Sequence, residues 1–447
     1  MYTCCRYYGL EGLQGHEGDS AFTVEVNHFT FGPGCLREAG SHARALGMKR
    51  IGLFTDKTVR DLPYVATVKR SLEAAGCTVE IYWECAVEPT GDSFMAAAKF
   101  AQEGKFDGFV SVGGGSVMDT AKAANLYATY PDELLAYVNA PIGLGKAVPG
   151  PLKPHIACPT TCGTGSEVTG IAICNLLEQQ CKTGILSRHM LPSRALLDPD
   201  VTHTLSPYVI AANGFDALSH ALESYTARPH SAKPKTYEGD DGAKRPMNQG
   251  ANLWSDMGAR EALRLIGQNL VAAVNDPRDQ QAAQARSAIM YSALIAGMTF
   301  SNAGCHLPHG MSYAVSGLVR DFKPPVGYPQ EQPMVPHGMS VVLNAPAVYR
   351  FTGEAAPERH LEGAQFLGAD THGADTKDAG EIVAGKLIEM MRAVNFPNGL
   401  NAVGYTDADA EALAERAFPQ QRVIKNAPRD VTKASLAELF KGAMKYW

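Results

Sequence analysis

Length, composition and charge narrow the classes of protein to which this chain can belong. A chain of 447 residues exceeds what one hydrophobic core usually supports, so we expect two domains. Hydrophobic residues make up 45% and charged residues 19%, as in an ordinary folded protein. The formal net charge of −6 provides no basic field for nucleic acid or an anionic membrane. No apolar run reaches the roughly 18–20 residues of a transmembrane helix.

The first residues and the cysteines indicate a reduced protein without a secretory signal. Residues 1–13 lack a basic region followed by an apolar one, so we expect a cytoplasmic location, or a mitochondrial one if the source is eukaryotic. The ten cysteines form no Cys-x-x-Cys pair, which argues against a zinc ribbon or a thioredoxin-type site. We interpret them as small buried residues. A metal clip of Cys4, Cys5 and His16 is an alternative, but a loose terminus explains this segment better.

The first two hundred residues alternate short β-rich runs with helical stretches. Such alternation predicts a parallel sheet covered by helices. We predict strands at residues 50–55, 78–83, 108–112 and 156–158, and helices at 64–75 and 93–102.

From about residue 205 onward the pattern changes to helical periods. These periods lie at 212–226, 256–274, 280–298 and 379–394 and predict an all-α second half. We therefore place an α/β domain at 1–205 and a helical domain at 206–447. Residues 227–252, rich in Pro, Lys, Asp and Gly, are predicted to form a surface loop or flap inserted in the helical domain.

A run of three glycines follows the strand predicted at 108–112. Gly113, Gly114 and Gly115 let the chain turn tightly, and we expect a helix to begin at Ser116. Backbone N–H groups at such a helix start can cradle a pyrophosphate. A plain glycine-rich turn is the alternative, because the run lacks the Gly-x-Gly-x-x-Gly form of an ordinary dinucleotide fold.

A second polar loop and one acid favour a dinucleotide ligand. The stretch 159–167 is dense in hydroxyl groups and glycine, which suit ribose, phosphate or nicotinamide amide groups. Asp56 ends the first predicted strand, where an acid can accept hydrogen bonds from ribose hydroxyls and would repel a 2′-phosphate. NAD is therefore favoured over NADP. A polar turn and a helix N-cap are the respective alternatives.

Four residues of the second half are candidate metal ligands. Asp216 and His220 are four residues apart in a helical stretch, so they share one helix face. His309 and His337 each begin an identical His-Gly-Met-Ser tetrapeptide. One carboxylate and three imidazoles without a thiolate suit Fe²⁺, Zn²⁺, Mn²⁺, Co²⁺ or Ni²⁺. A substrate oxygen needs a fifth or sixth coordination position, which favours iron over structural zinc.

These motifs together resemble those of the iron-containing (group III) alcohol dehydrogenases. The similarity lies in Gly113-Gly114-Gly115-Ser116-x-x-Asp119, in the 159–167 loop and in Asp216-Ala217-x-x-His220-Ala221-x-Glu223. It implies a Rossmann-like nucleotide-binding α/β domain with a parallel sheet and an all-α metal-binding domain, the fold shared with dehydroquinate synthase.

The resemblance also implies ligands and an assembly. It implies Fe²⁺, with Zn²⁺ or another divalent ion as alternatives, held by Asp216, His220, His309 and His337. It implies a small-molecule alcohol or hydroxyacid substrate and a homodimer or larger homo-oligomer, with no nucleic acid or membrane as partner. The residues implied for NAD are Asp56, Gly113, Gly114, Gly115, Ser116, Asp119, Thr160, Thr161, Thr164, Ser166 and Lys182.

Within that family the chain is similar to the branch of hydroxyacid–oxoacid transhydrogenases. Residues 305–317, 357–362 and the 227–252 insertion carry this similarity. The branch passes a hydride from 4-hydroxybutyrate to 2-oxoglutarate through a retained NAD. Many family members have a second histidine four residues after the ligand that corresponds to His309, but this chain has Tyr313 there. We therefore assign proton transfer to His306, Tyr313 or water, with packing as the alternative role of His306.

Three other functions are alternatives. An NAD-dependent dehydrogenase of simple primary alcohols would turn over free NAD. A lyase of the dehydroquinate-synthase type would need a cluster of basic residues for a phosphate, which the sequence does not show. A nucleotide-binding sensor or scaffold would be expected to lack at least one of the four metal ligands.

Overall fold

The chain forms two compact units, which we describe separately. The computed structural model describes residues 8, 18–179, 181–237, 241–276 and 278–447. One unit spans Val26–Leu205, and the other combines Ser206–Trp447 with the segment that ends at Glu25. Cys4, Cys5 and His16 of the alternative metal clip lie outside the described residues.

Residues 18–25 belong with the helical unit, so their predicted place in the α/β domain is wrong. The backbone N–H of Thr23 donates to Gln249 Oε1 at 2.8 Å, and Gln249 Nε2 donates to the Thr23 carbonyl at 2.7 Å. The N–H of Glu25 donates to Asn302 Oδ1 at 2.8 Å. This extended segment has no helical or strand period of its own, so its partners are invisible in the sequence.

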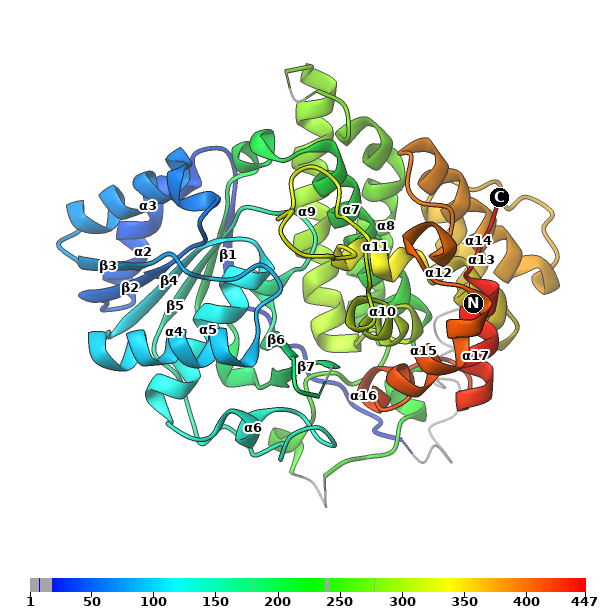
Figure 1. Ribbon diagram of the computed structural model, residues 1–447, viewed down its shortest axis with the longest axis horizontal. Helices are drawn as coiled ribbons and strands as arrows, with labels where there is room; N and C mark the ends of the chain where they lie inside the picture. Colours follow the sequence, from blue (N-terminus) through cyan, green and yellow to red (C-terminus); the bar gives the residue numbers. More distant parts are fainter. Residues whose placement is uncertain (1–7, 9–17, 180, 238–240, 277) are drawn as a thin grey trace. The chain divides into compact units, whose positions relative to one another are not determined.

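The α/β unit is built on a six-stranded parallel sheet with the order β1-β8-β5-β4-β2-β3. Figure 1 shows α2 and α3 on one face of this sheet and α4 and α5 on the other. The strands are β1 His28–Phe31, β2 Arg50–Phe54, β3 Thr78–Tyr82, β4 Gly108–Gly113, β5 His155–Pro159 and β8 Arg194–Leu197. The helices are α2 Ala39–Ala45, α3 Pro63–Ala74, α4 Gly91–Gly104, α5 Gly115–Thr129 and α6 Leu134–Tyr137.

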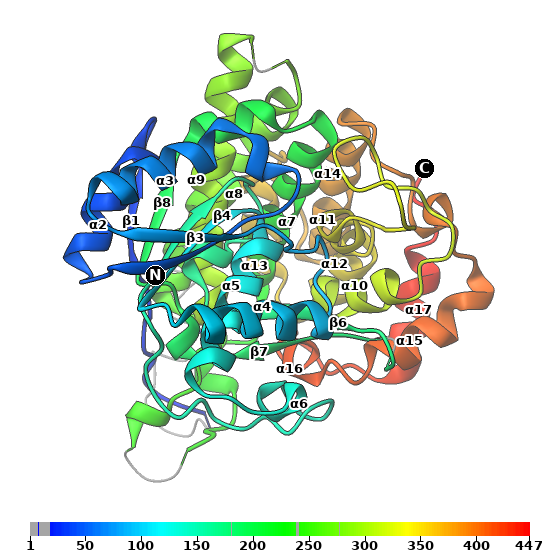
Figure 2. The same ribbon diagram turned by 60° about the vertical axis from the view of Figure 1, so that its left-hand side comes forward.

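The central strands are buried on both faces, as helices on both sides of a parallel sheet require. All six residues of β4 and all five of β5 are buried. Phe54 of β2 stacks on Phe109 of β4 with ring centroids 5.7 Å apart. The four predicted strands and two predicted helices are confirmed, with ends that differ by a few residues. The sequence did not indicate the antiparallel hairpin of β6 Ile171–Leu176 and β7 Cys181–Leu186, which Figure 2 shows beside α4.

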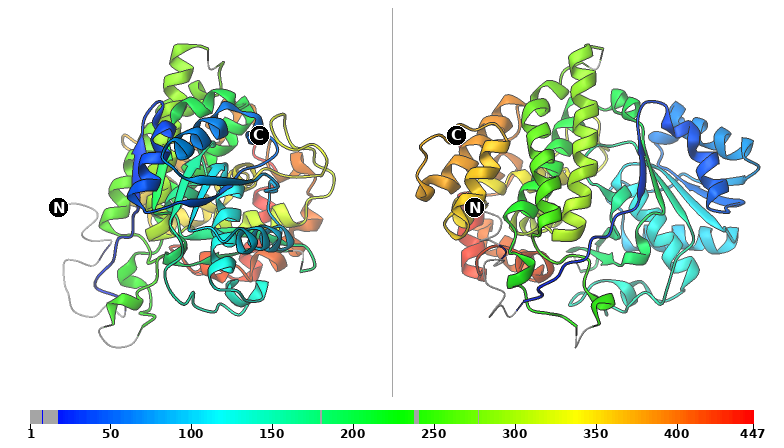
Figure 3. Two further views of the ribbon diagram at one scale, coloured as in Figure 1. Left: turned by 90° about the vertical axis from the view of Figure 1, so that its left-hand side faces the viewer. Right: turned by 180° about the vertical axis from the view of Figure 1, so that it is seen from behind.

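The second unit is helical, as predicted, and its described residues form isolated bridges but no strand. The long helices α8 and α9 lie side by side (Figure 3). The helices are α7 Pro207–Thr226, α8 Leu253–Ala273, α9 Gln280–Ala303, α10 Leu307–Gly317, α11 His337–Val342, α12 Ala345–Thr352, α13 Pro357–Phe366, α14 Ala379–Ala393, α15 Ala410–Ala417, α16 Gln421–Ile424 and α17 Lys433–Gly442. No described helix is both long and apolar enough to cross a bilayer.

The insertion at 227–252 is only partly the surface loop that its composition predicts. Its last residues are buried, among them Met247, Gln249 and Asn252. Asn252 caps α8, because its side chain accepts from the N–H of Ser255 while the Ser255 hydroxyl accepts from the N–H of Asn252. Polar side chains are buried here because backbone groups satisfy them, which composition alone does not reveal.

Candidate functional site

Helix α7 carries two of the predicted metal ligands on a buried face. Ser206 caps its start and Pro207 occupies its first turn, both favourable choices there. Asp216, His220 and Glu223 follow at spacings of four and three, so they line one side of the helix. Their exposed fractions are 2%, 4% and 0%. Three buried polar side chains on one face of a helix require polar partners from other segments or a bound ion.

The two His-Gly-Met-Ser tetrapeptides adopt matching local structures. The Ser312 hydroxyl donates to the His309 carbonyl at 2.8 Å, and the Ser340 hydroxyl donates to the His337 carbonyl at 2.7 Å. A Cβ at Gly338 would lie 1.9 Å from the Ala212 carbonyl oxygen. Glycine therefore lets α11 approach α7 closely enough to bring His337 to Asp216.

The structure brings the four predicted metal ligands together. From Asp216 Oδ1, the distances to the Nε2 atoms of His309, His337 and His220 are 3.4, 3.6 and 3.8 Å. Asp216 Oδ1 and His309 Nε2 are buried and have no hydrogen-bond partner among the described residues. A buried polar atom without a partner is costly, so this cluster is incomplete as a purely protein structure.

A divalent metal ion fits this cluster. For a metal–nitrogen distance of about 2.1 Å, ligand atoms at the corners of a tetrahedron lie roughly 3.4 Å apart, close to the separations observed. Burial lowers the pKa of His220 to about 4, which leaves its imidazole neutral and able to donate a lone pair. Burial also opposes charge on His309, yet Cys305, Glu223 and Asp216 raise its pKa well above the ordinary value. Surroundings that favour a proton here equally favour a metal cation.

Glu223 orients one of these ligands, a role that the sequence analysis did not assign. Its Oε1 lies 2.6 Å from His309 Nδ1, and its Oε2 accepts from the backbone N–H of His306 at 2.6 Å. When His309 Nδ1–H donates a hydrogen bond to this carboxylate, Nε2 is unprotonated and its lone pair is directed toward Asp216. Metal-binding histidines commonly have such a carboxylate partner. The motif around His220 contains Glu223, but only the fold brings His309 against it.

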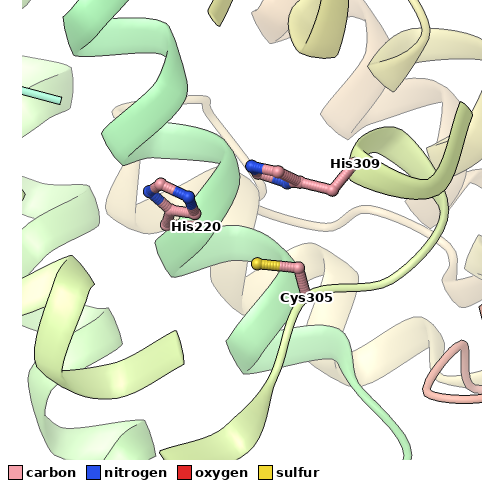
Figure 4. Close-up of side chains that lie close together, drawn as sticks. All are labelled: His220, Cys305 and His309. Carbon is pink, nitrogen blue, oxygen red and sulfur yellow. The ribbon is translucent and has the colours of Figure 1, made fainter. Parts of the chain in front are cut away.

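Cys305 is a second residue that the sequence analysis missed. Its Sγ lies within 4.8 Å of ligand atoms of His220 and His309, and Figure 4 shows the three side chains together. The site expected from the sequence contains no thiol. No spacing rule connects Cys305 with His220, since they lie on separate segments of the chain.

The two candidates for proton transfer have different surroundings. His306 is fully buried, and its Nε2 lies 3.0 Å from the Thr226 hydroxyl. These contacts favour the alternative that His306 packs within the unit. Tyr313 is 8% exposed and lies one turn after His309 on α10, the place expected from its spacing.

In the α/β unit, the glycine run and the Thr-rich loop lie against each other. The N–H of Thr160 donates to the Gly113 carbonyl at 2.9 Å. A Cβ at Gly115 would lie 2.7 Å from Thr164 Cγ2, and one at Gly114 would lie 3.1 Å from Thr161 Cγ2. The helix α5 begins at Gly115 without a side-chain cap, one residue before the predicted start at Ser116. Glycine here permits the close approach of the two loops.

Asp119 and Ser166 bind each other rather than standing open to a ligand. The Ser166 hydroxyl donates to Asp119 Oδ1 at 2.6 Å, and Asp119 Oδ2 accepts from the N–H of Ile173 at 2.9 Å. The buried Lys122, which the sequence analysis missed, donates to the Ser166 hydroxyl at 2.6 Å and to the carbonyls of Ser166 and Ile171 at 2.7 and 2.9 Å. Burial lowers the pKa of Lys122 to about 8. This network fixes the loop to α5.

Two further predicted cofactor residues also have protein partners. Asp56 Oδ1 accepts from the N–H groups of Thr58 and Val59 at 2.8 Å each, which is the alternative N-cap role. The other oxygen of the Asp56 carboxylate can accept a hydrogen bond from a ribose hydroxyl. Lys182 on β7 lies 2.5 Å from Glu88 Oε2, so its charge is already compensated. The sequence could not indicate Glu88, which is distant along the chain.

Two family models match most of the chain. The model of the iron-containing alcohol dehydrogenases matches residues 27–199, and the model of the C-terminal part of the Fe-containing alcohol dehydrogenase family matches residues 247–444. Both matches agree with the expected fold and order of units.

Curated relatives are similar over most of their length. A mitochondrial hydroxyacid-oxoacid transhydrogenase of Bos taurus is 46% identical, with 97% of this chain and 92% of the relative covered. The Homo sapiens protein of that name is 45% identical with the same coverage. A probable mitochondrial hydroxyacid-oxoacid transhydrogenase of Dictyostelium discoideum is 43% identical, with 95% and 79% covered.

Solved structures agree on the fold. A 1,3-propanediol oxidoreductase superposes with a TM-score of 0.81 at 28% identity, with 95% of this chain and 100% of that chain covered. An alcohol dehydrogenase from Oenococcus oeni gives the same TM-score and coverage at 27% identity. The expected α/β and helical fold is thereby confirmed. The cluster on α7, α10 and α11 and these comparisons lead to one conclusion: the chain belongs to the iron-containing alcohol dehydrogenase family of oxidoreductases.

Proposed function

We propose that the protein is a hydroxyacid–oxoacid transhydrogenase that transfers a hydride from 4-hydroxybutyrate to 2-oxoglutarate through a retained NAD. The proposal rests mainly on the buried cluster of Asp216, His220, His309 and His337, whose side-chain atoms have the separations expected of metal ligands. The relatives of that name, at 45–46% identity over nearly the whole chain, support a hydroxyacid and an oxoacid as the substrate classes.

The residues of α7, α10 and α11 would hold the divalent metal, Fe²⁺ in our proposal. When bound, it would supply a Lewis acid that lowers the pKa of the substrate alcohol. Asp216 provides the one negative charge, while the imidazoles of His220, His309 and His337 remain neutral donors. Glu223 holds the His309 ring in the productive tautomer. Phe300 stacks on His220 with centroids 4.0 Å apart and restricts that ring.

The loops of the α/β unit would hold NAD, which supplies the hydride acceptor. Backbone N–H groups at Gly115 and Ser116 would bind the pyrophosphate. Thr160, Thr161 and Thr164 offer hydroxyls near the same turn, and Asp56 offers its second carboxylate oxygen to the adenosine ribose. Asp119, Ser166 and Lys122 would act by fixing the loop, because their polar atoms bind one another.

Two further tasks fall to residues of this chain. We assign proton removal to Tyr313 or water, since the His306 ring is engaged with Thr226. A substrate carboxylate requires a cation. Arg188 and Lys182 are the two candidates for this role, and Lys182 lies 2.5 Å from Glu88 Oε2.

Turnover of 4-hydroxybutyrate by anaerobically purified, iron-loaded protein tests the proposal. One sample contains 2-oxoglutarate without added NAD, and the other contains free NAD alone. Succinate semialdehyde in the first sample only would establish the transhydrogenase. NADH in the second only would establish the alternative, an NAD-dependent alcohol dehydrogenase, which the similarity to the 1,3-propanediol oxidoreductase favours. Neither product, with the metal present, would contradict the proposed substrates.

The assembly and location are also proposals. We propose a homodimer or larger homo-oligomer, which light scattering on the purified protein would measure. For a bacterial source we propose the cytoplasm. For a eukaryotic source the names of the relatives support mitochondria.

A further inference from the structure

Cys305 occupies a loop that other residues hold firmly in place. The loop connects α9 to α10, and its Gly304 has a φ of +90°, a conformation that favours glycine. Asn426 Nδ2 donates to the carbonyls of Ala303 and Cys305 at 3.1 and 3.2 Å. The N–H of the next residue, His306, donates to Glu223. The backbone that carries the Cys305 thiol is therefore held by the fold on both sides.

The thiol lies beside two imidazoles, each of which has one buried nitrogen without a hydrogen-bond partner among the described residues. Cys305 Sγ and one nitrogen each of His220 and His309 lie within 4.8 Å of one another. Figure 4 shows the Cys305 sulfur directed to the side on which the two rings lie. His220 Nδ1 and His309 Nε2 are buried and have no hydrogen-bond partner among the described residues. The two rings stack with centroids 4.6 Å apart and 17° between their planes.

One sulfur and two imidazole nitrogens are a ligand set with its own metal preference. Thiolate with imidazole suits Zn²⁺, whereas the carboxylate of Asp216 adds a harder ligand for iron. A zinc ion bound by one sulfur and two nitrogens places these atoms roughly 3.6 Å apart. Since the three ligand atoms lie within 4.8 Å of one another, the closure needed is at most about 1.2 Å, and rotation of the cysteine side chain can move the sulfur by such a distance.

We propose that His220, Cys305 and His309 form a second metal position, selective for Zn²⁺, next to the position that Asp216 and His337 complete. On binding, the thiol loses its proton to solvent and three protein ligands leave a fourth place for water. Because His220 and His309 belong to both positions, the two positions compete for these rings. Zn²⁺ bound through Cys305 would therefore exclude the iron on which the proposed function rests.

Cobalt absorption tests this proposal directly, without any activity measurement. Co²⁺ is added to the metal-free full-length protein, and the near-ultraviolet band of thiolate-to-cobalt charge transfer is recorded. We expect the band in the wild type and its loss in Cys305→Ser. The matched control is Cys77→Ser in the α/β unit, where the Cys77 thiol donates to the Met48 carbonyl at 3.4 Å and serine can donate likewise. This variant should keep the band.

The outcomes separate this inference from the proposed function. Co²⁺ that binds without a thiolate band would overturn the zinc position and leave the Asp216 centre standing. No Co²⁺ binding at all would overturn both.

Competition between metals provides a second measurement. Loss of a residue that only hydrogen-bonds a metal ligand weakens metal binding roughly 10- to 100-fold. Cys305→Ser removes a ligand itself and should weaken Zn²⁺ binding by at least as much, with little change for Fe²⁺. Equal changes for both metals would contradict a separate thiol position.

Discussion

The two units carry their polar residues in opposite ways. In the helical unit, Asp216 and His309 present buried atoms that no described residue satisfies. In the α/β unit, Asp119, Ser166 and Lys122 satisfy one another, and the glycine turn at 113–115 lies against the Thr-rich loop. The first arrangement is completed only by a cation, whereas the second is complete and can offer backbone donors to an anion. Unsatisfied side chains therefore indicate a metal site, and satisfied ones around glycines indicate a cofactor loop.

The largest effect is expected for His309→Ala, which removes a ligand common to both proposed metal positions. Metal content should fall close to zero, and activity should fall by about 10³-fold or more, because the Lewis acid supplies several kcal/mol. Elemental analysis and turnover measure both quantities. The exposed His372 provides a control, His372→Ala, that should change neither. Full activity with retained metal would show that the unsatisfied side chains of the helical unit do not form the metal site.

Lys122→Met tests whether the α/β network is complete as it stands. It would leave Asp119 and two buried carbonyls without their cationic partner, at a cost of about 3 kcal/mol in the free energy of unfolding. Chemical denaturation measures this cost. Lys99→Met, on the exposed side of α4, should be nearly neutral. A stability equal to the wild type would show that Lys122 is not essential to the loop.

Glu223→Gln probes the orientation of His309. The amide can accept in only one of the two hydrogen bonds that the carboxylate accepts, so metal affinity should fall roughly 10- to 100-fold with the fold intact. Titration against a chelator measures the affinity. The exposed Glu358 gives the control Glu358→Gln. An unchanged affinity would reduce Glu223 to a structural role.

Gly115→Ala addresses the cofactor loop alone. Its Cβ would lie 2.7 Å from Thr164 Cγ2, and overpacking of this kind costs about 1–3 kcal/mol. The Kd for NAD should rise roughly tenfold or more, while metal content stays unchanged. Gly385→Ala on α14, where a Cβ would meet nothing within 4 Å, is the matched control. A simultaneous loss of metal would contradict the independence of the two sites.

The smallest effect is expected for Asp19→Asn, which breaks a satisfied ion pair near the surface. Partial burial opposes its ionisation, but hydrogen bonds from Arg245, Tyr237 and Ala21 lower the pKa of Asp19 from 3.8 to about 2. The pair therefore stabilises the fold above about pH 4 and loses this contribution as the pH falls toward 2. The variant should be less stable by about 1 kcal/mol at pH 7. A difference in melting temperature that does not shrink with acid would contradict this account.

Regular periods and contiguous motifs made much of this molecule predictable. The strands ending near Phe54 and Gly113 and the helix bearing Asp216 follow from runs of adjacent residues, so the sequence alone indicates them. The four metal ligands were candidates from their spacing and matching tetrapeptides, the family resemblance implied the same set, and the fold brings them together. Glu223, Lys122 and Cys305 acquire their roles through contacts with distant segments, which no local pattern encodes. Residues 18–25 were misplaced for the same reason.

The contact between Gly338 and the Ala212 carbonyl has a consequence for sequence variation. The two His-Gly-Met-Ser tetrapeptides have the same sequence but differ in how well they tolerate replacement of the glycine. Any Cβ at Gly338 would collide with backbone, which cannot yield, whereas one at Gly310 would meet only side chains, those of Ile424 at 3.1 Å and Val423 at 3.3 Å. In a library of random variants, the second tetrapeptide should therefore keep its glycine while the first accepts alanine.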